Sequence, residues 1–156
     1  MSDAPVGLII LSFILSFIAM EAVAWSTHKF IMHGPLWSWH QDHHQPTPGF
    51  WQRNDRFFLL FAIPGALLMV GGSVYHFPIA VSAGAGITAY GVTYFLLHDL
   101  LIHRRLVIFK SVKNPYLRAI RKAHQVHHRH RGQNPGECYG LLVVPIRYFR
   151  EAYRKA

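Results

Sequence analysis

The feature that most limits what this chain can fold into is a pair of long segments almost free of charged side chains. Segment 6–25 is interrupted only by Glu21, and segment 57–98 contains no Asp, Glu, Lys or Arg. About 20 apolar residues are enough for an α-helix to cross a bilayer. The second segment is long enough for two crossings, with a turn in the Gly-, Ser- and Pro-containing stretch 71–78. We therefore expect membrane spans at about 6–26, 57–75 and 79–97.

These spans determine the fold class. A soluble domain of 156 residues has too little interior to bury three such helices. We expect an all-α integral membrane protein with about three to four transmembrane helices, forming one domain over residues 1–156. Small residues in the segment 83–89 give the third span a surface for close helix packing.

Positive charge lies on one side of these spans. The chain has 16 Lys and Arg against 7 Asp and Glu, a formal net charge of +9. All of these basic residues fall in the segments 28–56 and 98–156, which three spans place on the same side. The positive-inside rule assigns that side to the cytoplasm. We expect a multi-pass protein of the cell inner (cytoplasmic) membrane, with its N-terminus outside. A basic face suits membrane lipid headgroups or an acidic protein, and we expect no nucleic-acid partner.

Histidine is the second unusual feature, because most of the 12 histidines form a repeated pattern. An H-x4-H pair follows the first span and another ends the third, and each pair is followed by an H-x2-H-H triplet. His76 and His130 lie outside the pattern and are interpreted as ordinary polar residues. The residues in the pattern are His28, His33, His40, His43, His44, His98, His103, His124, His127 and His128.

The two spacings have different helical interpretations. In an H-x2-H-H triplet, three imidazoles project from one side of a helix. Asn114 and Pro115 form a favourable N-cap and first turn for the helix that carries the last triplet. Residues five apart lie about 140° apart on an ideal helix. The H-x4-H pairs therefore flank one site, lie in a distorted helix, or serve two different metals.

Neutral imidazole is a common ligand of iron, zinc and copper. The repeated histidines exceed the roughly four to six ligands that one ion takes. The sequence therefore predicts a histidine-rich two-metal site on the cytoplasmic segments, with all the histidines of the pattern as ligands. The single Cys excludes a cysteine-based zinc site.

Carboxylates near the histidines are candidates for supporting roles. Asp42 and Asp99 can accept the outer ring N–H of a ligand, or they are solvated or capping carboxylates. Glu21 lies inside the first span, where a carboxylate is usually functional. We expect Glu21 to bond a ligand imidazole or a tyrosine, with direct metal ligation as the alternative.

Aromatic residues of the spans are candidates for a substrate path. Trp25, Tyr90 and Tyr94 either line a lateral entry between helices or serve as packing and interfacial anchors. The apolar stretch 139–149 is too short to span a bilayer, and its placement as re-entrant or interfacial is open.

The histidine pattern and its flanking residues resemble a known family. The segments Met32-His33-Gly34, Asn54-Asp55, 94–99 (YFLLHD) and 137–140 (ECYG) are similar to bacterial β-carotene hydroxylases. These belong to the wider membrane group of fatty-acid hydroxylases and sterol desaturases. The resemblance covers the chain from about Glu21 to Phe149.

The resemblance implies a non-haem di-iron monooxygenase. It implies two iron ions held by the histidines of the pattern, O2 as co-substrate, and electrons from a ferredoxin-type donor and its reductase. Zinc can replace iron in purified protein. The implied reaction is hydroxylation at carbon 3 of the β-ionone rings of β-carotene, giving β-cryptoxanthin and then zeaxanthin, with keto-carotenoids as further candidate substrates. The implied catalytic groups are the metal ligands alone.

Two alternatives accompany this interpretation. The first is a hydroxylase or desaturase of another bilayer lipid, a sterol or a fatty acid. The second is a membrane metal carrier, which is expected to place its ligands near the bilayer midplane rather than at one face.

Overall fold

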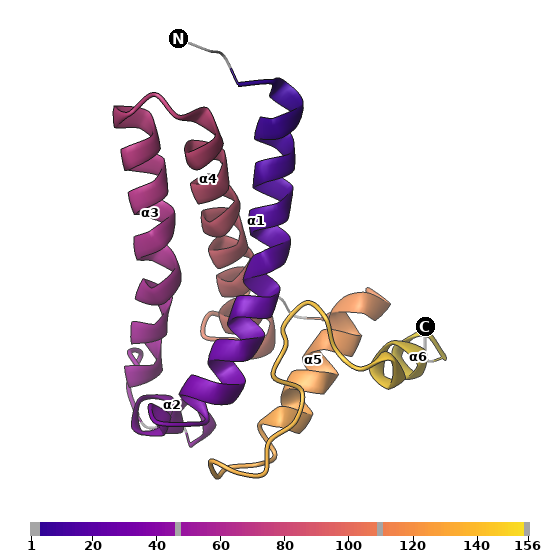
Figure 1. Ribbon diagram of the computed structural model, residues 1–156. Helices are drawn as coiled ribbons and strands as arrows, with labels where there is room; N and C mark the ends of the chain where they lie inside the picture. Colours follow the sequence, from indigo (N-terminus) through magenta and orange to yellow (C-terminus); the bar gives the residue numbers. More distant parts are fainter. Residues whose placement is uncertain (1–3, 46–47, 109–110, 155–156) are drawn as a thin grey trace. The chain divides into compact units, whose positions relative to one another are not determined.

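The computed structural model describes residues 4–45, 48–108 and 111–154. In these ranges every regular element is helical (Figure 1), which confirms the all-α prediction. The elements η1 and η3 are π-helical and η2 is a 3-10 helix. In chain order the elements are α1 (Val6–Ser26), η1 (Thr27–Met32), α2 (Trp37–His44), η2 (Arg53–Phe58), α3 (Leu59–Val74), α4 (Pro78–Tyr94), η3 (Phe95–Ile102), α5 (Pro115–His127) and α6 (Ile146–Arg154).

Three helical segments are long and apolar enough to cross a membrane: Val6–Met32, Arg53–Val74 and Pro78–Ile102. They correspond to the three predicted spans. The turn between α3 and α4 lies within the expected stretch 71–78, where the Phe77 N–H donates to the Gly72 carbonyl at 2.7 Å. Large apolar side chains of these helices are exposed, as expected for surfaces that face lipid.

The chain divides into two compact units, and a single domain remains a prediction. The first unit comprises residues 1–20 and 55–93, with most of α1, α3 and α4. The small residues of α4 pack as expected: a Cβ added at Gly84 lies 2.6 Å from the Gly65 carbonyl oxygen, and one at Gly86 lies 2.5 Å from that of Phe13. Close packing of α4 against both α1 and α3 therefore requires glycine at these two positions.

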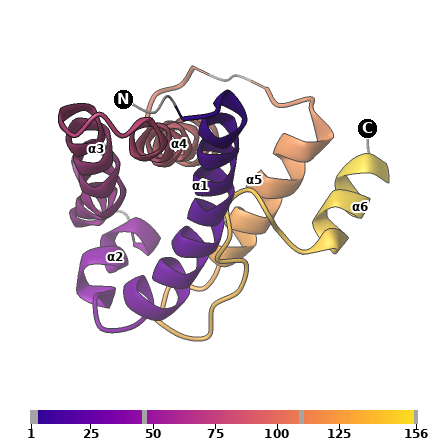
Figure 2. The same cartoon turned by 45° about the horizontal axis from the view of Figure 1, so that its top comes forward.

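The second unit comprises residues 21–54 and 94–156. Its helix α5 begins as predicted, because the Asn114 side chain accepts the Leu117 N–H at 3.1 Å and Pro115 occupies the first turn. Helices α5 and α6 lie side by side (Figure 2) and share an apolar core. The members of that core are Ala119, Ile120, Ala123, Val144, Tyr148 and Ala152.

Each H-x4-H pair begins in a π-helix and ends at the residue that caps it, His33 after η1 and His103 after η3. The His33 N–H donates to the His28 carbonyl at 3.0 Å, and the His103 N–H donates to the His98 carbonyl at 2.9 Å. A hydrogen bond between residues five apart is the defining bond of a π-helix. It brings residues five apart closer together around the helix axis than an α-helix does, so each pair presents both imidazoles to one side. The distorted-helix alternative is the one observed.

Candidate metal centre

The second unit gathers nine of the ten histidines of the pattern into two adjacent clusters, and the tenth, His128, lies against one of them. In each cluster, one ring nitrogen per histidine lies within 4.8 Å of the others. We call these the five-histidine cluster and the four-histidine cluster. The first contains His28, His33, His40, His44 and His127, and the second contains His43, His98, His103 and His124.

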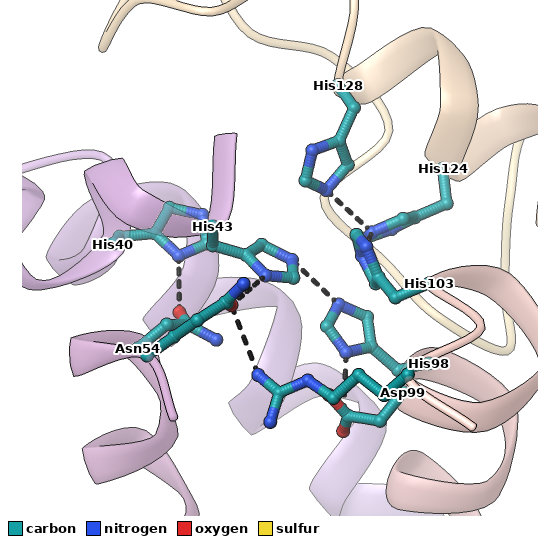
Figure 3. Close-up of polar contacts among 10 residues, drawn as sticks. His40, His43, Asn54, His98, Asp99, His103, His124 and His128 are labelled. Carbon is teal, nitrogen blue, oxygen red and sulfur yellow. Dashed lines mark hydrogen bonds and ion pairs between the residues drawn. The ribbon is translucent and has the colours of Figure 1, made fainter. Parts of the chain in front are cut away.

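His128 joins the four-histidine cluster. Its Nε2 lies 2.9 Å from Nε2 of His124, and its ring centroid lies 4.6 Å from that of His43 (Figure 3). The two clusters adjoin each other, since the rings of His44 and His128 stack with centroids 4.4 Å apart. The structure therefore brings every predicted ligand to one place.

Each H-x2-H-H triplet divides its side chains between the two clusters. On α2, His40 and His44 face the five-histidine cluster while His43 faces the other. At the end of α5, His124 and His128 face the four-histidine cluster, whereas His127 faces the five-histidine cluster. Each H-x4-H pair, in contrast, stays within one cluster. Each cluster thus combines an H-x4-H pair from one half of the repeat with ligands from both triplets.

The inner nitrogens lie at the spacing expected of ligands to one ion. Nε2–Nε2 distances are 3.1 Å for His28–His40, 3.1 Å for His40–His44 and 3.3 Å for His33–His127. In the other cluster they are 3.1 Å for His43–His98 and 2.9 Å for His103–His124. Two nitrogens bound at right angles to one ion, each at about 2.1 Å, lie about 3 Å apart.

The contacts of the outer ring nitrogens show which nitrogen of each ring carries the proton. Four Nδ1 atoms of the five-histidine cluster lie 2.7–2.9 Å from backbone carbonyl oxygens, so they donate and must carry the proton. The acceptors are the carbonyls of Tyr139 for His28, Gln133 for His33, His130 for His44 and Glu137 for His127. His40 Nδ1 lies 2.7 Å from Asn54 Oδ1.

A neutral ring with its proton on Nδ1 points an Nε2 lone pair inward. At about 3 Å these lone pairs face one another and repel, unless a cation lies between them. Burial keeps the rings neutral: it lowers the pKa of His44 to about 4 and the pKa values of His40 and His103 to about 2. Neighbouring imidazoles contribute to the same lowering of the pKa values, because two protonated rings would repel. The residues present therefore fit a pair of transition-metal ions.

Asp42 and Asp99, the predicted supporting carboxylates, both lie next to the histidine clusters but do not bond a ligand imidazole at hydrogen-bond distance. Asp42 is buried and accepts backbone N–H groups from Arg53 at 2.5 Å and Asn54 at 3.3 Å, so it holds the segment that carries the Asn54 amide. Asp99 pairs with Arg105, and its Oδ2 lies 3.6 Å from His98 Nδ1, at ion-pair rather than hydrogen-bond distance.

Glu21 has partners that we did not expect. Its Oε1 accepts the backbone N–H groups of Leu141, Leu142 and Val143 at 2.9–3.0 Å. Tyr139 lies two residues before this segment, and its carbonyl accepts from His28 Nδ1. Glu21 therefore reaches the five-histidine cluster through the backbone of this segment.

The predicted pocket aromatics lie in different surroundings. In the first unit, Tyr90 is fully buried, with its ring 5.6 Å from that of Phe17. In the second unit, the Tyr94 ring lies 4.6 Å from that of His98, next to the four-histidine cluster. Trp25 is partly exposed and packs edge-on against Phe30.

Several residues at the site were not assigned roles from the sequence. Asn54 accepts from His40, Gln52 approaches His43, and the Trp37 ring lies 5.2 Å from that of His33. Asn54 lies in a segment that carries the family resemblance, but that signal gives no partner. The backbone carbonyls that orient the histidines leave no residue-type signal at all.

Comparisons with known proteins agree with the pattern of the site. A family model described as fatty acid hydroxylase matches residues 13–146. A β-carotene hydroxylase of Pantoea ananas is 40% identical over 128 residues, which cover 82% of this chain and 73% of the relative. A β-carotene hydroxylase of Paracoccus sp. (strain PC1) is 35% identical over 82% of this chain and 79% of the relative. A chloroplastic β-carotene 3-hydroxylase of Arabidopsis thaliana is 35% identical over 82% of this chain and 43% of the relative. No solved structure matches the chain.

Proposed function

Because the chain belongs to the fatty acid hydroxylase family and, within it, to the β-carotene hydroxylases, we propose that it hydroxylates carbon 3 of the β-ionone rings of β-carotene. The products are β-cryptoxanthin and then zeaxanthin. Keto-carotenoid rings are a second substrate class for the same site. The observation that carries the proposal is the pair of buried histidine clusters in a membrane protein with 40% identity to such an enzyme.

Two iron ions are the proposed metals, one for each cluster. His28, His33, His40, His44 and His127 would hold one, and His43, His98, His103, His124 and His128 the other. With O2, two electrons and two protons, bound iron would supply the oxidant that an inert C–H bond requires: one oxygen atom would enter that bond and the other would leave as water. Imidazole sites intrinsically favour later metals, so zinc can occupy them in purified protein.

The chain's own residues perform three tasks in this proposal. The carbonyl acceptors of residues 130–139 and the Asn54 amide fix the rings with their lone pairs inward. Burial of the imidazoles keeps bulk water from the oxidising site. Tyr94, beside His98, is the proposed contact of the carotenoid ring nearest the metals, with Trp25 and Tyr90 as further candidates.

We further propose that the protein lies in the cytoplasmic membrane, with its histidine clusters on the cytoplasmic side and its N-terminus outside. The support is the confinement of Lys and Arg to the segments 28–56 and 98–156. A ferredoxin-type donor and its reductase, both on that side, would supply the electrons.

Expression in a bacterial host that makes β-carotene tests the activity. Pigment extracts of cells with the wild-type chain should contain zeaxanthin and β-cryptoxanthin by chromatography. The variant His127→Ala should leave β-carotene unchanged, because it removes a ligand. The matched control His76→Ala changes an exposed histidine outside both clusters and should retain the products. Unchanged β-carotene with well-expressed wild-type protein would rule out the proposed substrate.

The description of the matching family model supports one alternative, a hydroxylase acting on a fatty acid or another bilayer lipid. Lipid extracts of the same cells, compared with those of His127→Ala cells, distinguish it: a new hydroxylated or desaturated lipid with unchanged carotenoid favours the alternative. A metal carrier is a weaker candidate, because the inner nitrogens converge in two buried groups. Metal uptake that depends on the histidines would favour it.

A further inference from the structure

Arg105 lies just after η3, two residues beyond His103, and its side chain is only 14% exposed. Its Nε lies 3.1 Å from Asp99 Oδ1, and its Nη2 donates to Gln52 Oε1 at 3.1 Å. The guanidinium therefore joins two segments of the second unit that are far apart in sequence, the one after α2 and the one at η3.

Gln52 and Asp99 each face an outer nitrogen of the four-histidine cluster. Gln52 Oε1 lies 3.4 Å from His43 Nδ1, and Asp99 Oδ2 lies 3.6 Å from His98 Nδ1. The inner nitrogens of these same two histidines lie 3.1 Å apart (Figure 3). The Arg105 guanidinium therefore contacts the outer partners of two neighbouring histidines, His43 and His98, which come from different halves of the histidine repeat.

The contact with Gln52 determines which nitrogen of His43 carries the proton. A guanidinium has only donors, so Arg105 must face the oxygen of the Gln52 amide and not its NH2 group. That same oxygen faces His43 Nδ1, which must then donate, and the lone pair is left on Nε2. If the amide turned over, its NH2 would donate to Nδ1. The proton of His43 would then sit on Nε2, and the ring could not bind an ion from the cluster side.

We propose that Arg105 is a positioning residue that selects the metal-binding tautomer of His43 and holds Asp99 behind His98, and so maintains one metal site of the two. The proposal rests on the proposed function, because it assumes that the four-histidine cluster holds an ion. Loss of Arg105 should weaken metal binding at that cluster alone, since the outer nitrogens of the five-histidine cluster face backbone carbonyls and Asn54 instead.

Metal titration of the purified full chain in lipid nanodiscs tests the proposal without using activity. Protein stripped of metal is titrated with Fe(II) under anaerobic conditions and, separately, with Co(II), whose visible absorption reports the ligand geometry. Loss of an outer partner of a metal ligand typically weakens binding about ten- to a hundred-fold. Arg105→Gln should therefore weaken one of two sites by that factor, change the Co(II) spectrum of that site, and leave the other site unchanged. The matched control Arg104→Gln alters the exposed neighbouring arginine and should bind as wild type.

A second substitution tests the tautomer argument directly. A carboxylate has no donor end, so it accepts from His43 Nδ1 without having to be oriented. Gln52→Glu introduced into Arg105→Gln should therefore restore much of the lost affinity. A merely structural role for Arg105 predicts no such rescue. A general electrostatic role predicts that Arg105→Gln strengthens cation binding, because it removes a positive charge near the ion.

The outcomes are distinct. Unchanged affinity at both sites in Arg105→Gln, or loss at one site without rescue by Gln52→Glu, overturns the proposal. If Arg105→Gln does not fold, Gln52→Ala decides, because it leaves the Arg105–Asp99 pair intact: weakening of one site supports the proposal and unchanged binding overturns it. Wild-type protein that binds no metal overturns the proposed metal centre and this inference with it. Wild-type protein that binds two ions but makes no hydroxylated carotenoid refutes only the proposed reaction.

Discussion

Glu21 holds a short backbone segment through hydrogen bonds, and these bonds should slow the hydrogen exchange of the amides in that segment. One carboxylate oxygen accepts three successive backbone N–H groups, those of Leu141, Leu142 and Val143, at 2.9–3.0 Å. A hydrogen bond to a charged group contributes about 1.5–3 kcal/mol. Since about 1.4 kcal/mol corresponds to a factor of ten, loss of the carboxylate should speed hydrogen exchange at each of these amides by roughly ten- to a hundred-fold or more. The effect should be local, because the other backbone bonds of the chain are untouched.

Two variants separate the charge of Glu21 from its oxygen. Glu21→Ala removes the acceptor and should give the full increase in exchange. Glu21→Gln keeps a neutral acceptor, and neutral hydrogen bonds are roughly half as strong as charge-assisted ones, so its exchange should be intermediate. Deuterium uptake of the peptide 139–149, measured by mass spectrometry on protein in nanodiscs, follows the three amides together.

A control lies in the same segment. Glu137→Gln breaks the ion pair between Glu137 and Arg147, whose side chains are 40% and 61% exposed, and exposed pairs contribute little. It should leave the exchange of the peptide nearly unchanged. Equal exchange in Glu21→Ala and wild type would refute the assigned hydrogen bonds. Because the Tyr139 carbonyl in this segment orients His28, Glu21→Ala should also lower the metal content, and an unchanged content would show that Glu21 does not support the metal centre.

Three further predictions follow from single contacts. Asn54→Ala removes the acceptor of His40 Nδ1 and should weaken metal binding about ten- to a hundred-fold in the titration described above; wild-type affinity would contradict this. Gly86→Ala places a Cβ against Ser16 and should destabilise the helix packing by roughly 1–3 kcal/mol, seen as a lower melting temperature in detergent; an unchanged melting temperature would show that α1 and α4 pack less closely. Asn114→Ala should cost about 1 kcal/mol of stability while Asn114→Ser should not, and equal loss in both would contradict the N-cap.

Much of the fold could be predicted because the bilayer imposes simple rules on the sequence. The helix α1 has the bounds expected for the first span, and the turn between α3 and α4 lies in the Gly- and Pro-containing stretch where it was expected. Length and the absence of charge decide these features, and both are local properties of the sequence. The start of α5 was predictable for a similar reason, since Asn114 and Pro115 are adjacent in sequence and act on the next turn.

The residues of the candidate site were predictable, but their arrangement was not. Ten spaced histidines identify a set of ligands, whereas an ideal helix cannot place His28 and His33 together. A π-helical hydrogen bond places them together, and the His33 ring is held by the Gln133 carbonyl, which is 100 residues away along the chain. The same is true of Arg105, which acts through Gln52 at a distance of 53 residues along the chain. Backbone carbonyls and long-range side-chain contacts have no signature in a single sequence.

The division of the triplets between the clusters has a consequence for how metal binding and folding are coupled. His127 completes a cluster built mainly from residues 28–44, and His43 completes one built mainly from residues 98–128. Residues 55–93, which lie between these segments in the sequence, belong to the first unit. Neither segment alone can therefore offer the full ligand set of either cluster, and an ion that binds the complete set stabilises the docked arrangement of both. Until an ion binds, the facing Nε2 lone pairs oppose that arrangement. The outer hydrogen bonds through Asn54 and the carbonyls of residues 130–139 are what hold the rings in place against this repulsion.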